Sequence, residues 1–270
     1  MKDKQKLFLV VQFFIFTAMP LPHNEIHVFF DDGDVLNNNQ IRSRQWHKLI
    51  GKYLAPRFGG DPKEWGRANQ KIIEDFVNKG VPTLMYEHKE KDHHQFMEWF
   101  REKWINDMFD YMEIDRPTKS DYDRIYYETA EFVDLRVRSA FPGVKKTIKI
   151  LHEKGFNLYT CSGTESIELI YYLKGMGIKQ YFKTFYGPDL INTLKVDAAF
   201  YKAVFNDLDV IPPQAIIIDD KPYYLNIAQS LGAHVIQACL TGEFKPKFNY
   251  FIKHMKNLPL IIKKVNEREM

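Results

Sequence analysis

The sequence predicts an α/β protein in which a parallel sheet forms the core and an all-helical lobe is inserted after the first strand. Three observations predict this fold. From residue 141 onward, short apolar stretches alternate with amphipathic ones, a pattern typical of parallel strands joined by helical crossovers. A similar apolar stretch, residues 26–30, stands far ahead of the others. Between them, residues 41–140 show helical spacing and no convincing strand.

The first predicted strand, Ile26–Phe30, is a continuous run of apolar, β-branched and aromatic residues, which indicates a strand covered on both faces. The inserted lobe contains all four tryptophans, and we expect them to form a small core of its own. Its apolar residues recur at helical spacing in WHKLIGKYL (46–54), FMEWFREKWINDMFDYM (96–112) and YDRIYYETAEFVDL (122–135).

Pro142 and Gly143 end the helical block, and strands and helices then alternate strictly. The predicted elements are a helix in VKKTIKILHEKG (144–155), a strand in FNLYTCSG (156–163), a helix in ELIYYLKGMG (168–177), a strand in FKTFYG (182–187), a helix in AAFYKAVFNDL (198–208), a strand in AIIIDD (215–220), a helix in LNIAQSLG (225–232) and a strand in HVIQA (234–238).

We therefore place the sheet-forming core at residues 25–44 and 141–270, the helical lobe at 45–140 and an N-terminal extension at 1–24. The extension carries an apolar run, Leu7–Phe16, behind a lysine-bearing head. We interpret it as a loosely packed extension. A signal peptide or an N-terminal membrane anchor is the alternative, although the run is too short to span a bilayer.

Composition excludes disorder, because 45% of the residues are hydrophobic and 27% are charged. The formal net charge of +3 does not indicate a nucleic-acid partner, and we expect none. The two cysteines, Cys161 and Cys239, form neither a disulfide framework nor a metal-ligand spacing. They favour a reducing compartment, so we expect a cytoplasmic protein.

Polar residues come directly after three of the predicted strands: DDGD at 31–34, SGT at 162–164 and DD at 219–220. In an open parallel sheet, ligands bind beyond the carboxyl ends of the strands. Crowding carboxylates there is unfavourable unless a cation or a proton offsets their repulsion. These strand ends are therefore the candidate site.

Four motifs in this order resemble the haloacid dehalogenase superfamily of hydrolases, in its branch with a helical cap after the first motif. They are FFDDGDVL (29–36) with Asp31 as the nucleophile, LYTCSGT with Ser162, LKVDAAFY with Lys195, and IIIDD with Asp219 and Asp220. The resemblance implies a Rossmann-like core and an all-helical cap domain at the lobe defined above.

The resemblance also implies a Mg²⁺ site. Its ligands would be the Asp31 side chain, the backbone carbonyl of Gly33 and Asp220, with Asp219 as a further or indirect ligand. Mg²⁺ binds oxygen ligands and neutralises charge that builds during phosphoryl transfer.

The implied reaction is attack of Asp31 on a phosphorus atom to form an aspartyl-phosphate, which water then hydrolyses. Ser162 and Gly163 would bind phosphate oxygens at the start of the following helix. Lys195 would keep Asp31 ionised and pair with the phosphoryl group.

Two departures from the family pattern bear on activity. Gly33 occupies the place of the Asp that protonates the leaving group, a contribution typically worth about 10² to 10⁴ in rate. Tyr224 stands where the family often has an Asn or Asp that braces the metal site. An alternative register makes Asp32 the nucleophile and Asp34 the acid, but it would turn the reactive group to the other face of the strand.

The leading hypothesis is a Mg²⁺-dependent phosphatase of a small phosphorylated metabolite. The alternative is a catalytically weak relative that binds a phosphorylated ligand or a protein partner. Cleavage of a carbon–halogen bond is a third reading, which the Asp219–Asp220 pair disfavours because that reaction needs no metal. The sequence leaves the substrate, the oligomeric state and a membrane role of the extension open.

Two further groups of residues, histidines at 87–95 and arginines at 42 and 44, are candidate site residues. The histidines of EHKEKDHHQ (87–95) are more typical of a solvated helix or loop than of a metal site, because no set of carboxylates or cysteines recurs there at ligand spacing. Arg42 and Arg44 lie just beyond the first motif. They could face a substrate anion across the hinge of the cap, or be ordinary exposed arginines.

Overall fold

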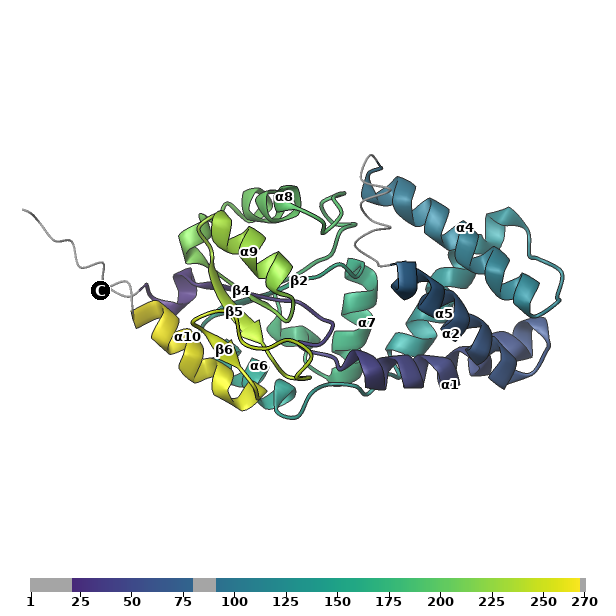
Figure 1. Cartoon of the computed structure of the whole chain (residues 1–270), viewed down its shortest axis with the longest axis horizontal. Helices are drawn as coiled ribbons and strands as arrows, with labels where there is room; N and C mark the ends of the chain where they lie inside the picture. The colour runs from purple at the N-terminus through teal and green to yellow at the C-terminus, as the bar shows by residue number, and fades with distance from the viewer. Residues whose placement is uncertain (1–20, 80–90, 268–270) are drawn as a thin grey trace, which may run out of the picture.

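The computed structural model describes residues 21–79 and 91–267. Figure 1 shows a part built on the sheet at the left and a helical part at the right. Most of the predicted extension falls outside the described residues. Of its last residues, Leu21 packs against the core, and His23 stacks on Phe156 with ring centroids 4.2 Å apart. Within the described ranges, no helix is both long enough and apolar enough to cross a membrane.

The core is a six-stranded sheet in the order β3-β2-β1-β4-β5-β6, and every neighbouring pair is parallel. This confirms the predicted α/β fold with a Rossmann-like parallel sheet. Strand β1 lies in the middle, between β2 and β4 (Figure 1). The strands are β1 (His27–Phe30), β2 (Asn157–Cys161), β3 (Thr184–Tyr186), β4 (Ala215–Asp219), β5 (His234–Ala238) and β6 (Phe251–Ile252).

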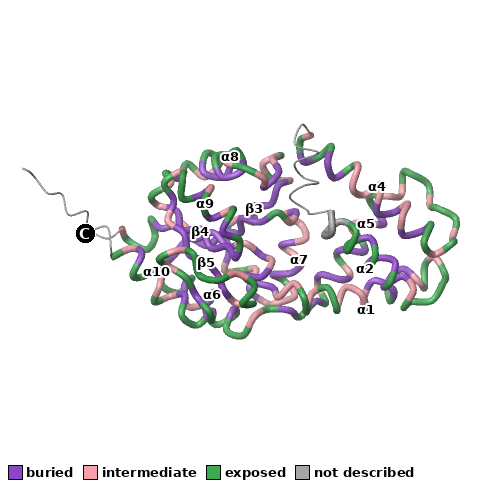
Figure 2. Tube along the Cα trace, in the orientation of Figure 1, coloured by how far each residue is buried: buried purple, intermediate pink, exposed green. Residues whose placement is uncertain are grey.

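Both faces of the sheet are buried. Successive side chains of a strand point to opposite sides, so a strand can contribute to a hydrophobic cluster on either face. Val28 and Phe30 belong to one hydrophobic cluster, and Phe29 belongs to another. Figure 2 shows the buried trace running through the strands, with exposed segments on the outer sides of the helices. Helices α6 (Val144–Glu153) and α10 (Leu258–Glu267) contribute to the first cluster, and α8 (Ala198–Leu208) and α9 (Pro222–Ser230) to the second.

The alternation predicted after residue 141 is confirmed element by element, and the structure adds a C-terminal strand and helix. Strand β6 has two residues, too few for a periodic signal, and Pro259 lies in the first turn of α10, where a missing N–H is tolerated. Short 3₁₀ helices occupy His23–Glu25, Lys119–Asp121, Lys179–Tyr181, Pro212–Gln214 and Met255–Asn257.

The inserted lobe is helical in the described residues, with α1 (Asn39–Phe58), α2 (Pro62–Lys79), α4 (His93–Tyr111) and α5 (Tyr122–Asp134). It has its own core, as predicted from the tryptophans. Trp65 and Trp104 are buried in it, and Trp46 and Trp99 pack against it. Helices α1 and α2 approach closely at Gly51, where a Cβ would lie 1.8 Å from the carbonyl oxygen of Pro62. Helix α1 crosses the proposed boundary at residue 44 without a break, and the division into domains stays a proposal.

The sheet order decides where the polar residues meet. In the register, Phe30 pairs with Thr160 of β2 and with Ile218 of β4. The residues that follow these three strands therefore leave the sheet side by side, at one edge. Helix α7 (Ser166–Met176) starts beyond the end of β2 and lies between the sheet and the helical lobe (Figure 1).

Candidate active site

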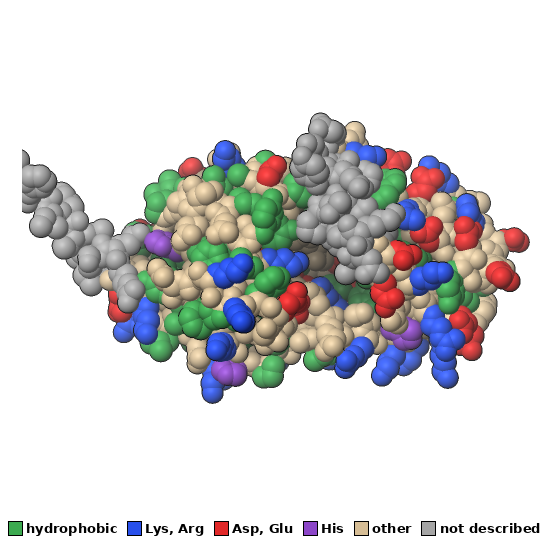
Figure 3. Space-filling view, in the orientation of Figure 1, with side chains coloured by type: hydrophobic (Ala, Val, Ile, Leu, Met, Phe, Trp, Pro, Cys, Tyr) green, Lys and Arg blue, Asp and Glu red, His purple; other side chains and the backbone are tan. Residues whose placement is uncertain are grey.

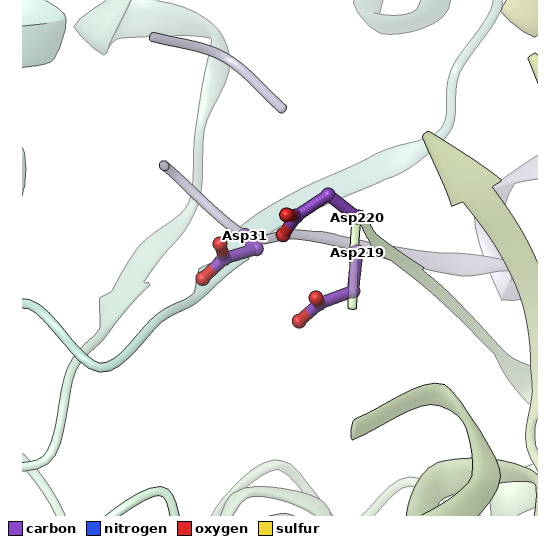
Figure 4. A group of neighbouring side chains, drawn as sticks. All are labelled: Asp31, Asp219 and Asp220. Atoms are coloured by element: carbon purple, nitrogen blue, oxygen red, sulfur yellow. The ribbon is translucent and has the colours of Figure 1, made fainter. Parts of the chain in front are cut away.

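Three carboxylates converge at the carboxyl ends of β1 and β4. Asp31 directly follows β1, Asp219 ends β4, and Asp220 comes next. One oxygen from each lies within 4.8 Å of the others. Figure 4 shows the Asp31 and Asp220 carboxylates close together, with Asp219 beside them. The backbone N–H of Asp31 donates to the Ile218 carbonyl at 2.9 Å, so the neighbouring strand sets the position of Asp31.

Lys195 holds two of these acids together. Its buried ammonium donates to Asp31 Oδ1 at 3.0 Å, to Asp219 Oδ2 at 2.8 Å and to the carbonyl of Cys161 at 2.9 Å. Burial works against the charge of Lys195, but Asp219 and Asp31 outweigh it and raise its pKa. The three residues come from distant parts of the chain and share one buried ion-pair network.

Asp220 lacks such a partner. Its Oδ1 is buried and has no hydrogen-bond partner among the described residues. Burial, reinforced by the charges of Asp219 and Asp31, raises its pKa to about 8. A divalent cation would favour the ionised form and satisfy the orphaned oxygen. The oxygen-only donor set of Asp31, Asp219 and Asp220 therefore fits Mg²⁺.

The loop after β2 places Ser162 and Gly163 at the same edge of the sheet. The Ser162 N–H donates to the Tyr186 carbonyl of β3 at 3.1 Å, and its hydroxyl accepts the Thr164 N–H at 3.4 Å. Gly163 is exposed, and a Cβ there would meet no described atom within 4 Å. The loop thus leaves open space over Gly163 just before the N-terminus of α7, where backbone N–H groups favour an anion.

The acids of the loop after β1 point in different directions. Asp31 faces Lys195, whereas Asp32 is fully buried and pairs with Arg42. Asp34 adopts a left-handed backbone with φ 56° and is buried rather than solvent-facing. The carbonyl of Gly33 belongs to this same turn. The contacts of Asp32 and Asp34 are thus separate from the Lys195 network that joins Asp31 to Asp219.

The three asparagines that follow each have a definable task. Asn37 donates to Asp32 at 2.6 Å, and Asn38 caps α1 by accepting the Ile41 N–H at 2.9 Å. Asn39 donates to both oxygens of Asp34, at 3.0 and 2.8 Å. The run NNN at 37–39 is the sequence signal of this tightly bonded turn.

The aromatic ring of Tyr224 lies beside two lysines at the site. Its centroid lies 4.8 Å from the ammonium of Lys195 and 5.9 Å from that of Lys221, a residue that sequence reasoning missed. The phenol therefore faces the cations of the site, in the place where the family resemblance implies a brace for the metal.

A buried polar contact joins the helical lobe to α7. His93, at the start of α4, lies 2.9 Å from Glu165 through Nε2, and Tyr127 of α5 donates to the same carboxylate oxygen at 3.3 Å. The expectation of solvated histidines was wrong for His93, which is buried, because Glu165 gives its ring a partner. His94 is exposed, and His88 lies outside the described residues.

Residues 69–238 match the family model of haloacid dehalogenase-like hydrolases. The chain belongs to this hydrolase family. The match includes Ser162, Lys195, Asp219 and Asp220, and the structure adds Asp31 to them through the ion pair with Lys195. The resemblance seen in the four motifs is thereby confirmed at the level of the family.

One relative of this hydrolase is named for a pyrophosphatase activity. A Clostridium perfringens (strain 13 / Type A) protein named "Putative pyrophosphatase PpaX" is 28% identical over 130 residues, covering 46% of this chain and 60% of that protein. The match thus spans less than two thirds of the relative's length.

Two solved structures share the fold. YfnB from Bacillus subtilis, bound to magnesium, has a TM-score of 0.57 at 15% identity and covers 88% of this chain and 98% of its own. A 2-haloacid dehalogenase from Pseudomonas syringae pv. Tomato DC3000 has a TM-score of 0.58 at 17% identity, with the same coverage of 88% and 98%. At this identity the likeness concerns the fold, so the choice of reaction depends on the residues of the site.

Proposed function

We propose that this hydrolase is a Mg²⁺-dependent phosphatase that acts through an aspartyl-phosphate on Asp31. The observation that carries the proposal is the meeting of Asp31, Asp219 and Asp220 around one point, with Lys195 paired to two of them. Asp220 is left without a hydrogen-bond partner for its buried Oδ1 among the described residues. A divalent cation bound by Asp31, Asp220, the Gly33 carbonyl and, directly or indirectly, Asp219 would satisfy that oxygen and polarise a phosphoryl oxygen.

The residues of the chain divide the remaining work. Asp31 presents a carboxylate oxygen to phosphorus, and the Lys195 ammonium holds that carboxylate ionised and in position. Ser162 and the Gly163 amide, ahead of α7, bind phosphoryl oxygens. Because these groups are fixed by strands and buried hydrogen bonds, they need little rearrangement as charge develops on the phosphoryl group.

The helical lobe at 45–140 serves in this proposal as a cap over the site. Its contact with the sheet part through His93 and Glu165 is buried and polar. The substrate is a small phosphorylated metabolite rather than a nucleic acid. On the face that Figure 3 shows, acidic and basic side chains are interspersed.

The test is release of inorganic phosphate from a panel of phosphorylated metabolites, with Mg²⁺ and with a chelator. Turnover that needs Mg²⁺, together with a phosphorylated peptide containing Asp31 after acid quenching, is the expected result. Metal-independent release of halide from a 2-haloacid would instead assign the site to carbon–halogen cleavage. Tight binding of a phosphorylated compound without turnover would favour a binding protein, for which the Gly at position 33 is the motivating observation.

Gly187→Ala is expected to lower kcat/KM by about 10²-fold, because small displacements of a phosphate-binding loop have effects of this size. Gly187 follows β3, and a Cβ there would lie 2.3 Å from the Thr164 carbonyl oxygen and 2.7 Å from the Ser166 nitrogen. The Ser162 loop would have to move. Steady-state kinetics on the best substrate measures the effect.

Asn206→Ala, at an exposed position of α8, is the control. It lies outside the Ser162 loop and should retain more activity than Gly187→Ala. Equal activity of Gly187→Ala and the unmodified protein would contradict the proposed role of the loop.

Asp220→Asn is expected to stabilise the metal-free protein by an amount that grows with pH. The Asp220 pKa is about 8 in the folded protein, against about 4 for an unfolded carboxyl. Its contribution to stability is therefore fully present below the unfolded value and is lost as the pH rises through the folded value. The difference in unfolding temperature should widen from about pH 4 to about pH 8 and then stay level.

Thermal unfolding in a chelator across this pH range measures the difference. Asp115→Asn, at an exposed position in the helical lobe, serves as the control. With Mg²⁺ added, the order should reverse, because only the unmodified protein keeps the ligand. A difference between the two proteins that does not change with pH would contradict the prediction.

A further inference from the structure

Polar contacts form a closed ring around Gly33. Arg42, in the first turn of α1, donates from Nη1 to Asp32 and from Nη2 to the side-chain oxygen of Asn39. Asn39 donates through its backbone N–H and its side-chain amide to Asp34. The ring therefore fixes a guanidinium and an amide beside the loop that carries the proposed nucleophile.

These two groups fill the space that a side chain at position 33 would enter. A Cβ on Gly33 would lie 2.9 Å from Asn39 Nδ2 and 3.3 Å from Arg42 Nη2. This is the position at which the family resemblance implies the acid that protonates the leaving group. In this chain, hydrogen-bond donors stand there in place of a carboxyl.

The change of group changes the chemistry available. Burial works against the charge of Arg42, but the pairing with Asp32 outweighs it and raises the guanidinium pKa further above its ordinary value. A guanidinium is a permanent cation with N–H donors, so it stabilises an oxyanion but does not hand over a proton.

Within the part of the chain that the structure describes, Arg42 also has donors to spare. Nη1 and Nη2 carry two hydrogens each, and Asp32 and Asn39 each take one. The Arg42 side chain keeps 19% of its surface accessible, whereas that of Asp32 is at 0%. Asp32 and Asn39 thus anchor the guanidinium, whose Cζ lies 5.1 Å from the centroid of the Tyr172 ring. The N–H groups that these contacts leave over are suited to binding phosphate or carboxylate.

We propose that Arg42 and Asn39 form a leaving-group subsite that selects phosphoryl donors whose leaving group departs as an oxyanion, namely phosphoanhydrides and acyl phosphates. This inference rests on the proposed phosphatase function and specifies its substrate class. Alkyl phosphates fit poorly, because an alkoxide needs the general acid that Gly33 does not supply.

The two steps balance without that acid. In the first, an Asp31 oxygen bonds to phosphorus, the bridging P–O bond breaks, and the bridging oxygen leaves with the electron pair as part of a phosphate or a carboxylate. Arg42 holds this charge and no proton is transferred. In the second, a water oxygen bonds to phosphorus, the bond to Asp31 breaks, the carboxylate is regenerated, and the water proton leaves with the inorganic phosphate or to solvent.

The first experiment compares kcat/KM of the full chain with Mg²⁺ on pyrophosphate, acetyl phosphate and glycerol 3-phosphate. Since a missing general acid is worth about 10² to 10⁴ in rate, at least one of the first two should exceed glycerol 3-phosphate by about 10²-fold or more. Comparing pyrophosphate with acetyl phosphate shows whether the subsite prefers a phosphate or a carboxylate as the leaving group. The inference would be overturned if kcat/KM for glycerol 3-phosphate came within about tenfold of the value for the better of the other two substrates.

The second experiment tests Arg42 itself. Removing Arg42 alone would leave Asp32 buried without its partner, so the double variant Asp32→Asn, Arg42→Met removes both charges. Its fold is checked by thermal unfolding. For the preferred anhydride or acyl phosphate, kcat/KM should fall by about 10²-fold, the loss typical of one charge-stabilising donor, and the fall for glycerol 3-phosphate should be much smaller. An equal loss on both substrates would show a merely structural role and overturn the inference.

Binding of the non-hydrolysable imidodiphosphate with Mg²⁺, measured by calorimetry, separates this inference from the proposed function. If no phosphorylated compound is turned over, the phosphatase proposal fails, and binding then decides the subsite by itself. Affinity about tenfold weaker in the double variant than in the unmodified protein, the loss of one charged contact, supports the subsite. Equal affinity overturns it.

Discussion

Asp31→Asn is expected to lower turnover by about 10³-fold or more, because the amide replaces the nucleophile of the first chemical step. The change preserves shape, and the side-chain oxygen of the amide can still accept the hydrogen bond from Lys195. It also removes one of three acidic groups whose oxygens lie within 4.8 Å of one another. The metal-free variant should therefore unfold at the same or a higher temperature, so a loss of turnover would not reflect a loss of fold.

Asp32→Asn is the matched control, and it also tests the alternative register. Asp32 is fully buried and paired with Arg42, not with Lys195. Its substitution should lower the unfolding temperature by weakening that pair, while the phosphorylated Asp31 peptide still forms. Kinetics and peptide mass spectrometry of both variants provide the measurement. Loss of the phosphorylated intermediate in Asp32→Asn, with retention in Asp31→Asn, would refute the assignment of Asp31.

Lys195→Met is expected to have the largest effect on folding. The ammonium is buried and donates three hydrogen bonds, two of them to Asp31 and Asp219. Without it Asp31 and Asp219 lose the buried counter-ion that they share, and breaking a buried ion pair in this way typically costs about 3 to 5 kcal/mol. Turnover should be lost as well, since nothing then holds Asp31 ionised and oriented.

The loss should depend on conditions in a way that identifies its cause. Added Mg²⁺ should restore part of the stability by supplying positive charge to the same acids. Lower pH should also reduce the loss, because protonation removes the repulsion. Chemical unfolding of Lys195→Met with and without Mg²⁺ measures this, and Lys202→Met, at an exposed position of α8, is the control. A loss insensitive to both Mg²⁺ and pH would point to packing instead of charge.

Much of this molecule could be predicted because its patterns are local. Ile26–Phe30 reads as a doubly buried strand, and Val28 and Phe29 do lie in separate clusters on the two faces of the sheet. The placement of polar residues at the ends of strands predicted the edge at which Asp31, Ser162 and Asp219 leave the sheet. The alternation of strands and helices predicted the parallel topology, because a helix between two strands forms a crossover connection, which is right-handed in nearly all parallel sheets.

Other features depend on contacts that no local pattern encodes. The pairing of Arg42 with Asp32 needs a specific turn, whose asparagines look like ordinary loop residues in the sequence. His93 reads as solvated in its charged neighbourhood, yet it is buried against Glu165, which lies 72 residues away. Strand β6 pairs with β5 and has only two residues, too few to give a periodic pattern of its own.

The sequence by itself determined the fold class, the family motifs and the identity of the acids at the strand ends. Only the tertiary structure decided which acid of the first motif faces Lys195, which one is neutralised by Arg42, and what occupies the space beside Gly33. The physical reason is that hydrophobic periodicity acts between residues a few positions apart. The charge and orientation of a carboxylate depend on partners brought together by folding, here across 164 residues between Asp31 and Lys195.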